Sequence, residues 1–332
     1  MFAPLTIANQ AYASHVMLAP MCGVGDRPYL EICREVDTQS ILASEMVSAP
    51  ALANGGRNTT EMIDFQSVNG PVMIQIFGHD PAQLATGSRM IEEAGADMIS
   101  MNFGCPAKKI VKNCDGAALL RTPEKIGELV EACVKATKIP MVAKMRIGWD
   151  DTSRNYLTVA RIMVEAGAHS IAVHGRTREQ GYSGEADWEA IKEIAAKVDV
   201  PIIGNGDIDG PETAMRRMRE SGVAGVMIGR AAMGNPWVIH RTAHYLATGE
   251  LLPAPTPAER IAMAIVHARK LIAFKDERFG VVESRKHVSW YTSGLPGSAE
   301  VRLKVNQAKS ADELLGLLMA YMEQASPRAL AS

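Results

Sequence analysis

The clearest fold signal in this chain is Met98-Ile-Ser-Met-Asn-Phe-Gly-Cys-Pro106. It is a short apolar run. A helical pattern precedes it and ends in a glycine turn, Glu93-Ala-Gly-Ala-Asp97. An apolar run entered in this way is typical of a buried parallel strand. Strand-end loops carry the chemistry of α/β barrels. A lone cysteine is more often a small buried hydrophobe, but Gly104 and Pro106 restrict the backbone here and favour a reactive Cys105.

Seven further apolar runs resemble this one and are separated by helical patterns. Several follow the same small-residue phrase, at Ala94–Asp97, Ala166–His169 and Ser221–Ala224, which is typical of a helix that ends at a glycine before a buried strand. Eight such units match the number and length expected of a (β/α)8 barrel. A doubly wound parallel sheet is the alternative, but no strand followed by GxGxxG and a helix supports it. The eight runs are His15–Ala19, Ser40–Ser44, Val72–Ile76, Met98–Asn102, Met141–Met145, Ser170–His174, Pro201–Asn205 and Gly225–Gly229.

The pattern changes after the eighth run. The segment Gly249–Pro257 is rich in proline, and helix-compatible sequence follows it to the C-terminus. Thr256 stands directly before Pro257, as a capping residue stands before the first position of a helix. We therefore expect an α/β protein with a TIM barrel over residues 1–240, followed by a smaller all-helical domain over residues 241–332.

Composition narrows the class of protein. With 332 residues, 47% hydrophobic and 22% charged, the chain is an ordinary globular protein. No apolar run reaches the roughly 18 residues that cross a bilayer, and Met1–Ile7 lacks the basic start of a signal peptide. Five cysteines without a CxxC pair argue against a disulfide scaffold or a zinc site. We expect a cytoplasmic protein without membrane segment, metal or obligatory protein partner.

Charge is unevenly distributed along the chain. The total of 35 basic and 37 acidic residues gives a net charge of −2. Residues 241–310 hold 11 Lys/Arg and 6 Asp/Glu, a balance of +5, so the remainder carries 24 − 31 = −7. A neutral total argues against a nonspecific nucleic-acid coat protein, whereas a locally basic segment can follow a phosphate backbone. A normally solvated helical surface explains the same charges equally well.

Polar residues gather at the carboxyl ends of the runs and together describe a flavin site. The turn Pro20-Met-Cys22 could lay backbone against a flat ring, and the Gln75 amide can both donate to and accept from a heterocycle. A lysine inside an apolar strand, Lys144, is costly to bury unless an anion or a buried carboxylate meets it. The glycine-rich ends of the last two runs are at the usual phosphate-binding site of this barrel. We predict that the cofactor-binding residues are Pro20, Met21, Cys22, Gln75, Lys144, His174, Asn205, Gly206, Asp207, Gly229 and Arg230.

The strand-end motifs recur together in one known family. They are Ala19–Met21, Gln75, Met101–Pro106, Lys144–Arg146, Val173–Arg176, Gly204–Asp207 and Ile228–Arg230. This series resembles that of the tRNA-dihydrouridine synthases, and the resemblance covers roughly residues 5–310. The bacterial B branch of that family is resembled by a C-terminal set, Arg285–Tyr291 with Gly294–Gly297 and Arg302. Two stretches depart from the family pattern, Pro20–Asp26 and Asn113–Gly116. The first puts a second thiol, Cys22, near the expected flavin; neither removes a catalytic group.

The resemblance implies a reaction. It implies tightly but noncovalently bound FMN, NADPH as a transient reductant, and reduction of specific uridines in the tRNA D-loop to 5,6-dihydrouridine. Reduced FMN would give a hydride from N5 to C6 of the uracil, and Cys105 would act as the catalytic acid toward C5. A thiol with an ordinary pKa of roughly 8.5 is mostly protonated at neutral pH. Lys144 would stabilise the charge of the reduced flavin, His174 and Arg230 would hold its phosphate end, and Asn205 and Asp207 its chain.

The partner implied by the resemblance is tRNA. Basic groups interleaved with aromatic ones bind phosphates and stack bases. Trp290 and Tyr291 fit that description, although a place in a helical core explains them equally well. Asn102 would fix the edge of the uracil. The predicted substrate-binding residues are Asn102, Lys108, Arg176, Arg178, Arg285 and Lys286.

Three other functions fit parts of the sequence. An FMN barrel reductase or oxidase of a free pyrimidine, as in dihydroorotate oxidation, would share the flavin residues but would not require a basic C-terminal domain. A Schiff-base aldolase would use Lys144 and would be colourless. A non-catalytic RNA-binding protein would leave the Cys105 loop and the flavin residues unexplained.

Overall fold

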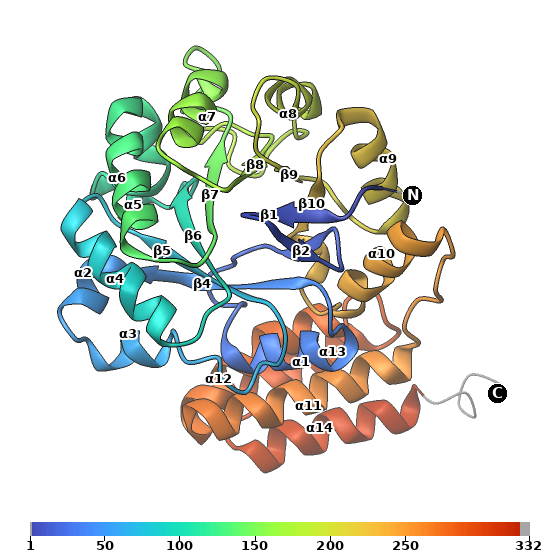
Figure 1. Cartoon of the computed structure of the whole chain (residues 1–332). Helices are drawn as coiled ribbons and strands as arrows, with labels where there is room; N and C mark the ends of the chain where they lie inside the picture. Colours follow the sequence, from blue (N-terminus) through green and yellow to red (C-terminus); the bar gives the residue numbers. More distant parts are fainter. Residues whose placement is uncertain (1, 326–332) are drawn as a thin grey trace.

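Eight parallel strands form a closed barrel, in the order β10-β3-β4-β5-β6-β7-β8-β9 around its circumference (Figure 1). The computed structural model describes residues 2–325; residue 1 and residues 326–332, at the outer ends of the two predicted domains, lie outside it. Each predicted apolar run forms one barrel strand, so the predicted (β/α)8 barrel is confirmed. The strands are β3 (Val16–Leu18), β4 (Ile41–Ser48), β5 (Val72–Phe77), β6 (Met98–Phe103), β7 (Met141–Arg146), β8 (Ser170–His174), β9 (Ile202–Asn205) and β10 (Gly225–Ile228).

A short hairpin that was not predicted from the sequence closes one end of the barrel. Its strands, β1 (Leu5–Ile7) and β2 (Gln10–Tyr12), pair antiparallel. The turn holds Ala8 and Asn9 at φ values of 50° and 65°, and two successive positive φ values suit the twist of a tight hairpin. Both end residues of β1 are buried among the inward-facing side chains at the amino ends of the barrel strands. The hairpin therefore plugs that end of the barrel.

Helices surround the barrel and cover the outward-facing side chains of its strands (Figure 1). Ile74, Ile99 and Met101 belong to this apolar layer between strands and helices. Burying one such side chain contributes about 1.5–3 kcal/mol, which is why this face of each strand is apolar. The elements around the barrel are α1 (Arg27–Val36), α2 (Ala49–Ala53), α3 (Arg57–Glu61), α4 (Pro81–Glu93), α5 (Lys108–Lys112), η1 (Gly116–Arg121), α6 (Pro123–Ala136), α7 (Tyr156–Glu165), α8 (Trp188–Ala195), α9 (Pro211–Ser221), η2 (Arg230–Ala232) and α10 (Trp237–Thr248).

Inside the barrel, the amino half is apolar. Met73, Met98, Val142 and Met227 point inward there and form a second cluster beneath the hairpin. Successive side chains of a strand face opposite sides, so the next inward positions lie two residues further along each strand. Those positions begin the polar half of the barrel, which is the end that carries the candidate site.

The C-terminal helices have an apolar core of their own. They are α11 (Pro257–Lys275), α12 (Glu277–Tyr291), α13 (Ser298–Gln307) and α14 (Ala311–Gln324). In Figure 1, α11, α12 and α14 lie side by side next to α1. Thr256 caps α11 as predicted, in a reciprocal capping box with Glu259.

The domain division at residues 240 and 241 falls inside α10. The buried Val238 and Leu246 of this helix belong to the apolar cluster of the barrel, and the separate C-terminal core begins at Ile261. The assignment of residues 241–332 as a functional domain stays a prediction. No helix within residues 2–325 combines the length and apolar character needed to cross a bilayer.

Candidate active site

The polar ends of the barrel strands meet in one layer at the carboxyl end of the barrel. Residues paired between neighbouring parallel strands face the same side of the sheet. The register pairs Gln75 with Ser100, Asn102 with Lys144, and His174 with Asn205. The structure therefore brings together five of the predicted site residues, which lie on five different strands.

Asn102 holds the loop that carries Cys105. Its side-chain oxygen accepts hydrogen bonds from the backbone N–H groups of Gly104, at 2.9 Å, and Cys105, at 2.8 Å. Its amide nitrogen donates to Oε1 of Gln75 at 2.7 Å, and Nε2 of Gln75 donates to Oγ of Ser100 at 3.1 Å. These bonds tie the loop after β6 to β5. The predicted contacts of Asn102 with a uracil and of Gln75 with a cofactor stay predictions beside this positioning role.

Arg146 fixes the other side of the Cys105 loop. Its Nε donates to the carbonyl oxygen of Gly104 at 2.7 Å, and its Nη1 donates to the carbonyl oxygen of Thr177 at 2.9 Å. The loops after β6, β7 and β8 are thereby joined through one guanidinium. No role was predicted for Arg146 from the sequence. Its position two residues after Lys144, on the same inward face of β7, was the available signal.

The two thiols at the mouth of the barrel are neutral at pH 7. Burial raises the pKa of Cys105 above its ordinary value, although the nearby Arg146 and Lys144 act in the opposite direction. The Cys105 side chain remains partly exposed. Removal from water, and then the charge of Glu45, raises the pKa of Cys22 to about 11. Each thiol can therefore donate a proton, and neither is a ready nucleophile, since nucleophilic attack requires the thiolate.

Lys144 is a cation without an anionic partner. Its Nζ donates to Oδ1 of Asn205 at 3.2 Å, and the amide nitrogen of Asn205 donates to the carbonyl oxygen of Met227 at 2.7 Å. No carboxylate within residues 2–325 forms an ion pair with this ammonium group. Burial, and then repulsion from Arg146, lowers the pKa of Lys144 to about 7. An anionic ligand would favour the charged form and be bound by it.

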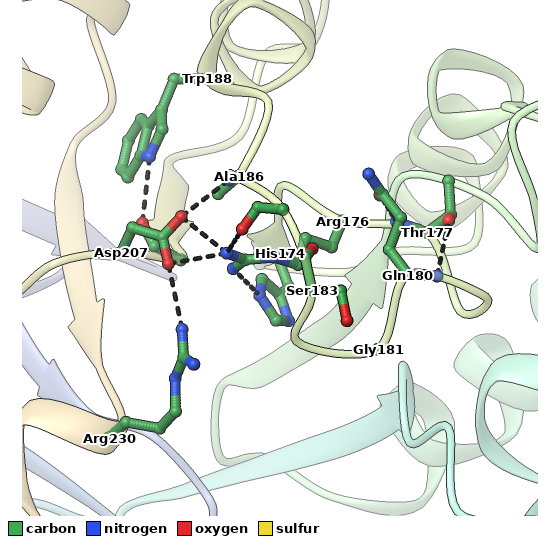
Figure 2. A network of polar contacts seen from close by, with 12 residues as sticks. His174, Arg176, Thr177, Gln180, Gly181, Ser183, Ala186, Trp188, Asp207 and Arg230 are labelled. Atoms are coloured by element: carbon green, nitrogen blue, oxygen red, sulfur yellow. Dashed lines mark hydrogen bonds and ion pairs between the residues drawn. The ribbon is translucent and has the colours of Figure 1, made fainter.

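Asp207 joins the ends of β8, β9 and β10 (Figure 2). Its carboxylate accepts two hydrogen bonds from Nη2 of Arg176, at 2.8 and 2.9 Å, and one each from the Ala186 N–H, at 2.7 Å, and Nη2 of Arg230, at 3.0 Å. The Arg176 side chain is only 2% exposed, so its guanidinium faces Asp207 and its predicted substrate contact stays a prediction. The Arg230 side chain pairs with Asp207 through Nη2 alone and is 55% exposed, so its other N–H groups can meet an anion.

Gly206 allows the chain to pass close beneath His174. Its φ is +120°, and a Cβ there would lie 2.6 Å from Cβ of Ala186 and 3.0 Å from Cδ2 of His174. The Gly206 carbonyl accepts a hydrogen bond from Nε1 of Trp188 at 3.0 Å (Figure 2). Burial and four neighbouring cations hold the pKa of His174 far below its usual range. His174 is therefore a neutral hydrogen-bonding group at pH 7.

The turn after β3 lies beside the end of β10. The Gly25 N–H donates to the carbonyl oxygen of Met21 at 2.9 Å and closes a turn that presents Cys22 at the surface. A Cβ added at Gly229 would lie 3.9 Å from Sδ of Met21. The predicted cofactor residues Pro20, Met21, Cys22 and Gly229 thus lie on one side of the barrel mouth.

Tyr182 is a residue of this region that was not predicted from the sequence. It lies in the loop between β8 and α8 and is 59% exposed. The guanidinium carbons of Arg146 and Arg230 lie 5.6 and 5.2 Å from its ring centroid, and the His174 ring lies 6.1 Å away. The two arginine contacts are cation–π interactions over one aromatic ring. The sequence could not predict this role, because a single tyrosine in a loop belongs to no periodic pattern.

Two of the predicted RNA-binding residues follow barrel strands. Lys108 is exposed at the start of α5, three residues after Cys105. Arg178 lies in the loop after β8, where its guanidinium carbon is 4.6 Å from the ring centroid of Trp149. Both therefore belong to segments that follow strands at the carboxyl end of the barrel, and their contact with substrate stays a prediction.

Arg285 and Lys286, also predicted to bind the substrate, lie on α12 and have partners within the protein. Nη2 of Arg285 donates to the carbonyl oxygen of Ala308 at 2.8 Å, and Nζ of Lys286 lies 3.5 Å from Oε2 of Glu283. Tyr291 on the same helix is completely buried, in agreement with its place in a helical core. Substrate binding by Arg285 and Lys286 stays a prediction.

The arrangement suits a planar heterocycle with an anionic tail. The mouth has an amine without a carboxylate partner in the described part of the chain, at Lys144, and an exposed guanidinium at Arg230, beside the hydrogen-bonded amides of Gln75 and Asn205. A flavin nucleotide needs such a set, because its ring edge both donates and accepts hydrogen bonds and its reduced ring and phosphate are negative. Cys105 adds an acid beside that set. No group of three or more His, Cys, Asp or Glu side chains within residues 2–325 is arranged to hold a metal ion.

Solved structures share this fold. A 2-naphthoyl-CoA reductase in complex with 2-naphthoyl-CoA superposes with a TM-score of 0.57 at 12% identity, covering 74% of this chain and 52% of its own. A variant of NCR from Zymomonas mobilis superposes with a TM-score of 0.54 at 14% identity, covering 76% of this chain and 92% of its own. At these identities the likeness concerns the barrel fold alone.

Sequence comparisons identify the family. The dihydrouridine synthase family model matches residues 17–326. The tRNA-dihydrouridine synthase B of Xanthomonas axonopodis pv. citri is 40% identical over 96% of both chains, and that of Pseudomonas aeruginosa is 40% identical over 93% of this chain and 91% of its own. A probable tRNA-dihydrouridine synthase of Rickettsia bellii is 40% identical over 91% of this chain and 93% of its own. The chain therefore belongs to the dihydrouridine synthase family, and as predicted from its motifs it is an oxidoreductase that uses a flavin.

Proposed function

We propose that this protein reduces uridines in the D-loop of tRNA to 5,6-dihydrouridine, with noncovalently bound FMN and with NADPH as a transient reductant. Family membership and the names of the relatives support the substrate. The observation that carries the proposal is the pairing, at one barrel mouth, of a neutral and partly exposed thiol, Cys105, with an unpaired cation, Lys144. Such a pair offers an acid for the substrate and a counter-charge for the reduced cofactor.

The predicted cofactor residues divide into those for the ring and those for the phosphate. When bound, the flavin supplies the hydride that reduces the uracil. Gln75, Lys144 and Asn205 would hold the edge of the ring, and the turn Pro20–Cys22 would meet its face. The phosphate end would meet His174, Arg230 and the backbone at Gly206, Asp207 and Gly229. Over the part of the chain that the structure describes, one phosphate-binding position at β9 and β10 and the lack of a dinucleotide-binding unit favour FMN over FAD.

Cys105 would supply the proton. Hydride addition at C6 of a uracil leaves negative charge conjugated with the C4 carbonyl, and a proton must then reach C5. Burial keeps the thiol protonated at pH 7, so it can donate that proton from a fixed position. Asn102 and Arg146 hold the loop from both sides, which maintains the distance between the acid and the bound base.

The substrate must open to reach the site. A uridine inside a folded tRNA has to leave its stack to enter a barrel mouth, so the protein must grip the RNA around it. Residues 241–332 would bind the tRNA as a domain, because residues 241–310 carry a net charge of +5. Lys108 and Arg178 would contact the RNA from the barrel. We place this activity in the cytoplasm.

Reconstitution tests the proposal. Purified holoenzyme is incubated with NADPH and an unmodified tRNA transcript, and dihydrouridine is measured by mass spectrometry together with NADPH oxidation. We expect dihydrouridine at D-loop positions and none with Cys105→Ala. A flavin-loaded enzyme that oxidises NADPH but leaves tRNA unmodified, or that turns over orotate or dihydroorotate instead, would favour the free-pyrimidine alternative.

A further inference from the structure

A bulge in β4 turns Glu45 toward the turn that follows β3. The pairing of β4 with β5 shifts register between Ala43 and Met46, and bulges of this kind re-aim side chains beside active sites. The backbone N–H of Glu45 donates to the carbonyl oxygen of Gly25 at 3.0 Å, and its carboxylate accepts a hydrogen bond from the backbone N–H of Gly23. One residue thus fixes both the middle of this short loop, at Gly23, and its end, at Gly25.

Lys286 reaches the same turn from α12. Gly23 has a φ of +74°, and a Cβ at this position would lie 3.2 Å from Nζ of Lys286. The glycine therefore leaves room for the ammonium group directly against the turn. The Glu45 carboxylate and the Lys286 ammonium group therefore meet the same residue of the turn, Gly23. Burial raises the pKa of Glu45, and the positive charges of Lys275 and Lys286 oppose that rise.

A chain of charges leads from Lys286 back to the barrel. Oε2 of Glu283 lies 3.5 Å from Nζ of Lys286 and 2.7 Å from Nζ of Lys275, at the end of α11. Nζ of Lys275 also lies 3.1 Å from Oδ2 of Asp26, which caps α1 by accepting a hydrogen bond from the Tyr29 N–H at 3.3 Å. These groups are partly buried, so their interactions are less screened than those of surface pairs.

We propose that Lys286 is a positioning residue of the active site. Acting with Glu45, it holds the turn Met21–Gly25 in the position that meets the flavin, so that the C-terminal helices complete the cofactor site as well as serving the tRNA. The inference rests on the proposed function, because it requires the bound flavin. Lys286 acts through Gly23 and Glu45 and contacts neither substrate nor reacting atoms. A direct phosphate contact by the same lysine, as predicted from the sequence, is the competing role.

The test compares full-length holoenzymes carrying Lys286→Met, Lys286→Arg and Lys270→Met with the wild type. Lys270 is the matched control, since it too joins a C-terminal helix to the barrel. It lies on α11, and its Nζ is 3.0 Å from Oε2 of Glu31 and 3.1 Å from Oε1 of Glu35, both on α1. We expect Lys286→Met to shift the visible absorption bands of the flavin and to lower kcat for NADPH oxidation about tenfold, a loss of ~1.4 kcal/mol. KM for tRNA should stay unchanged. Lys286→Arg should restore both values, and Lys270→Met should match the wild type.

A different set of results would overturn the inference. An unchanged flavin spectrum, together with weaker tRNA binding and a smaller salt dependence, would make Lys286 a phosphate contact. If Lys286→Met does not fold, Glu45→Gln serves as the second variant, since it keeps the shape and an acceptor oxygen but removes the charge; an unchanged spectrum in this variant would also refute the idea. Failure of the proposed function looks different, because the wild type itself would then lack flavin or form no dihydrouridine.

Discussion

At the scale of single residues, the site depends on side chains that occupy unusual electrostatic surroundings. Cys105 keeps its proton because burial outweighs two neighbouring cations, whereas Lys144 is close to losing its own because burial and Arg146 act together. The same barrel mouth therefore holds an acid that stays neutral and a base that is easily charged. Each role leads to a separate test.

Replacing Cys105 with alanine should separate the two halves of the reaction. We expect flavin content and NADPH oxidation to remain near wild-type levels, while dihydrouridine formation falls about 10²–10⁴-fold, the usual loss for a general acid. Rapid-mixing kinetics on each half-reaction measures this. Cys22→Ala is the control, since its thiol lies at the same mouth. Wild-type turnover in Cys105→Ala, with loss in Cys22→Ala, would transfer the role to Cys22.

Lys144 should make cofactor retention depend on pH. Its pKa of about 7 in the protein means that the charged form dominates below pH 7 and is lost above it. The ring that Lys144 would meet is negative when the flavin is reduced, and the charged lysine binds that form, so retention of reduced flavin should weaken as pH rises from 7 to 9. Flavin remaining after anaerobic dialysis of the reduced enzyme at each pH measures this. Lys144→Met should hold less flavin at every pH and lose the dependence, and Lys144→Arg should hold flavin at high pH. Equal retention in all three proteins would contradict the assignment.

At the scale of elements, the contact between the C-terminal helices and α1 contains a buried histidine pair. His267 on α11 and His287 on α12 have ring centroids 4.1 Å apart, and the His267 ring stacks on Tyr29 of α1 at 5.5 Å. Neither imidazole has a hydrogen-bond partner among residues 2–325. This contact is therefore stable only while both rings are neutral.

Stability should consequently fall as the solution becomes acidic. Burial, with nearby lysines acting in the same direction, lowers the pKa of His267 to about 3 from its ordinary 6.5, and that of His287 is lowered as well. Between the folded and unfolded pKa of each ring, the unfolded chain binds a proton that the folded protein does not. The free energy of unfolding therefore decreases, as the pH falls, by up to ~1.4 kcal/mol per pH unit for each ring. Urea unfolding between pH 7 and 5 measures this slope.

A matched pair of variants tests the source of that slope. His267→Leu removes one buried titrating ring and should flatten the dependence on pH. His240→Leu changes an exposed histidine of α10 and should leave the slope as in the wild type. If both variants keep the wild-type slope, other groups cause the loss of stability in acid.

At the scale of the whole molecule, charge is divided unevenly between two parts of the chain. The barrel and C-terminal tail together carry −7 while residues 241–310 carry +5, so RNA must approach a barrel that is acidic on average. Basic residues placed locally at its mouth have to offset this repulsion. Lys108 and Lys109 follow the Cys105 loop and are both exposed.

Removing those two lysines should weaken binding of tRNA and flatten its salt dependence. Each lost phosphate contact lowers the slope of log K against log[salt] by roughly 0.7–0.9, so Lys108→Ala with Lys109→Ala should lower it by about 1.5. Fluorescence titrations at several salt concentrations measure the slope. Lys135→Ala with Lys192→Ala is the charge-matched control, because these lysines pair with acidic neighbours on α6 and α8. An equal loss in the control would make the effect one of net charge.

Local patterns in the sequence determined the barrel and its polar end. The eight apolar runs and their glycine turns depend on neighbours in the chain, as does the capping box at Thr256. The alternation of side chains along each strand places Gln75, Lys144 and His174 on the inward face without further information. The family follows from the same motifs, since they combine residue type with order along the chain.

The interactions among these residues follow from the folded chain and not from local sequence. The hairpin at Leu5–Tyr12 is too short to show periodicity, and its role as a plug exists only against the closed barrel. Tyr182 and Arg146 gain their roles from loops that follow different strands. Lys286 faces Gly23, which is more than 260 residues away in the chain. Burial, charge pairing and pKa depend on distances through space, and a linear pattern contains no such distances.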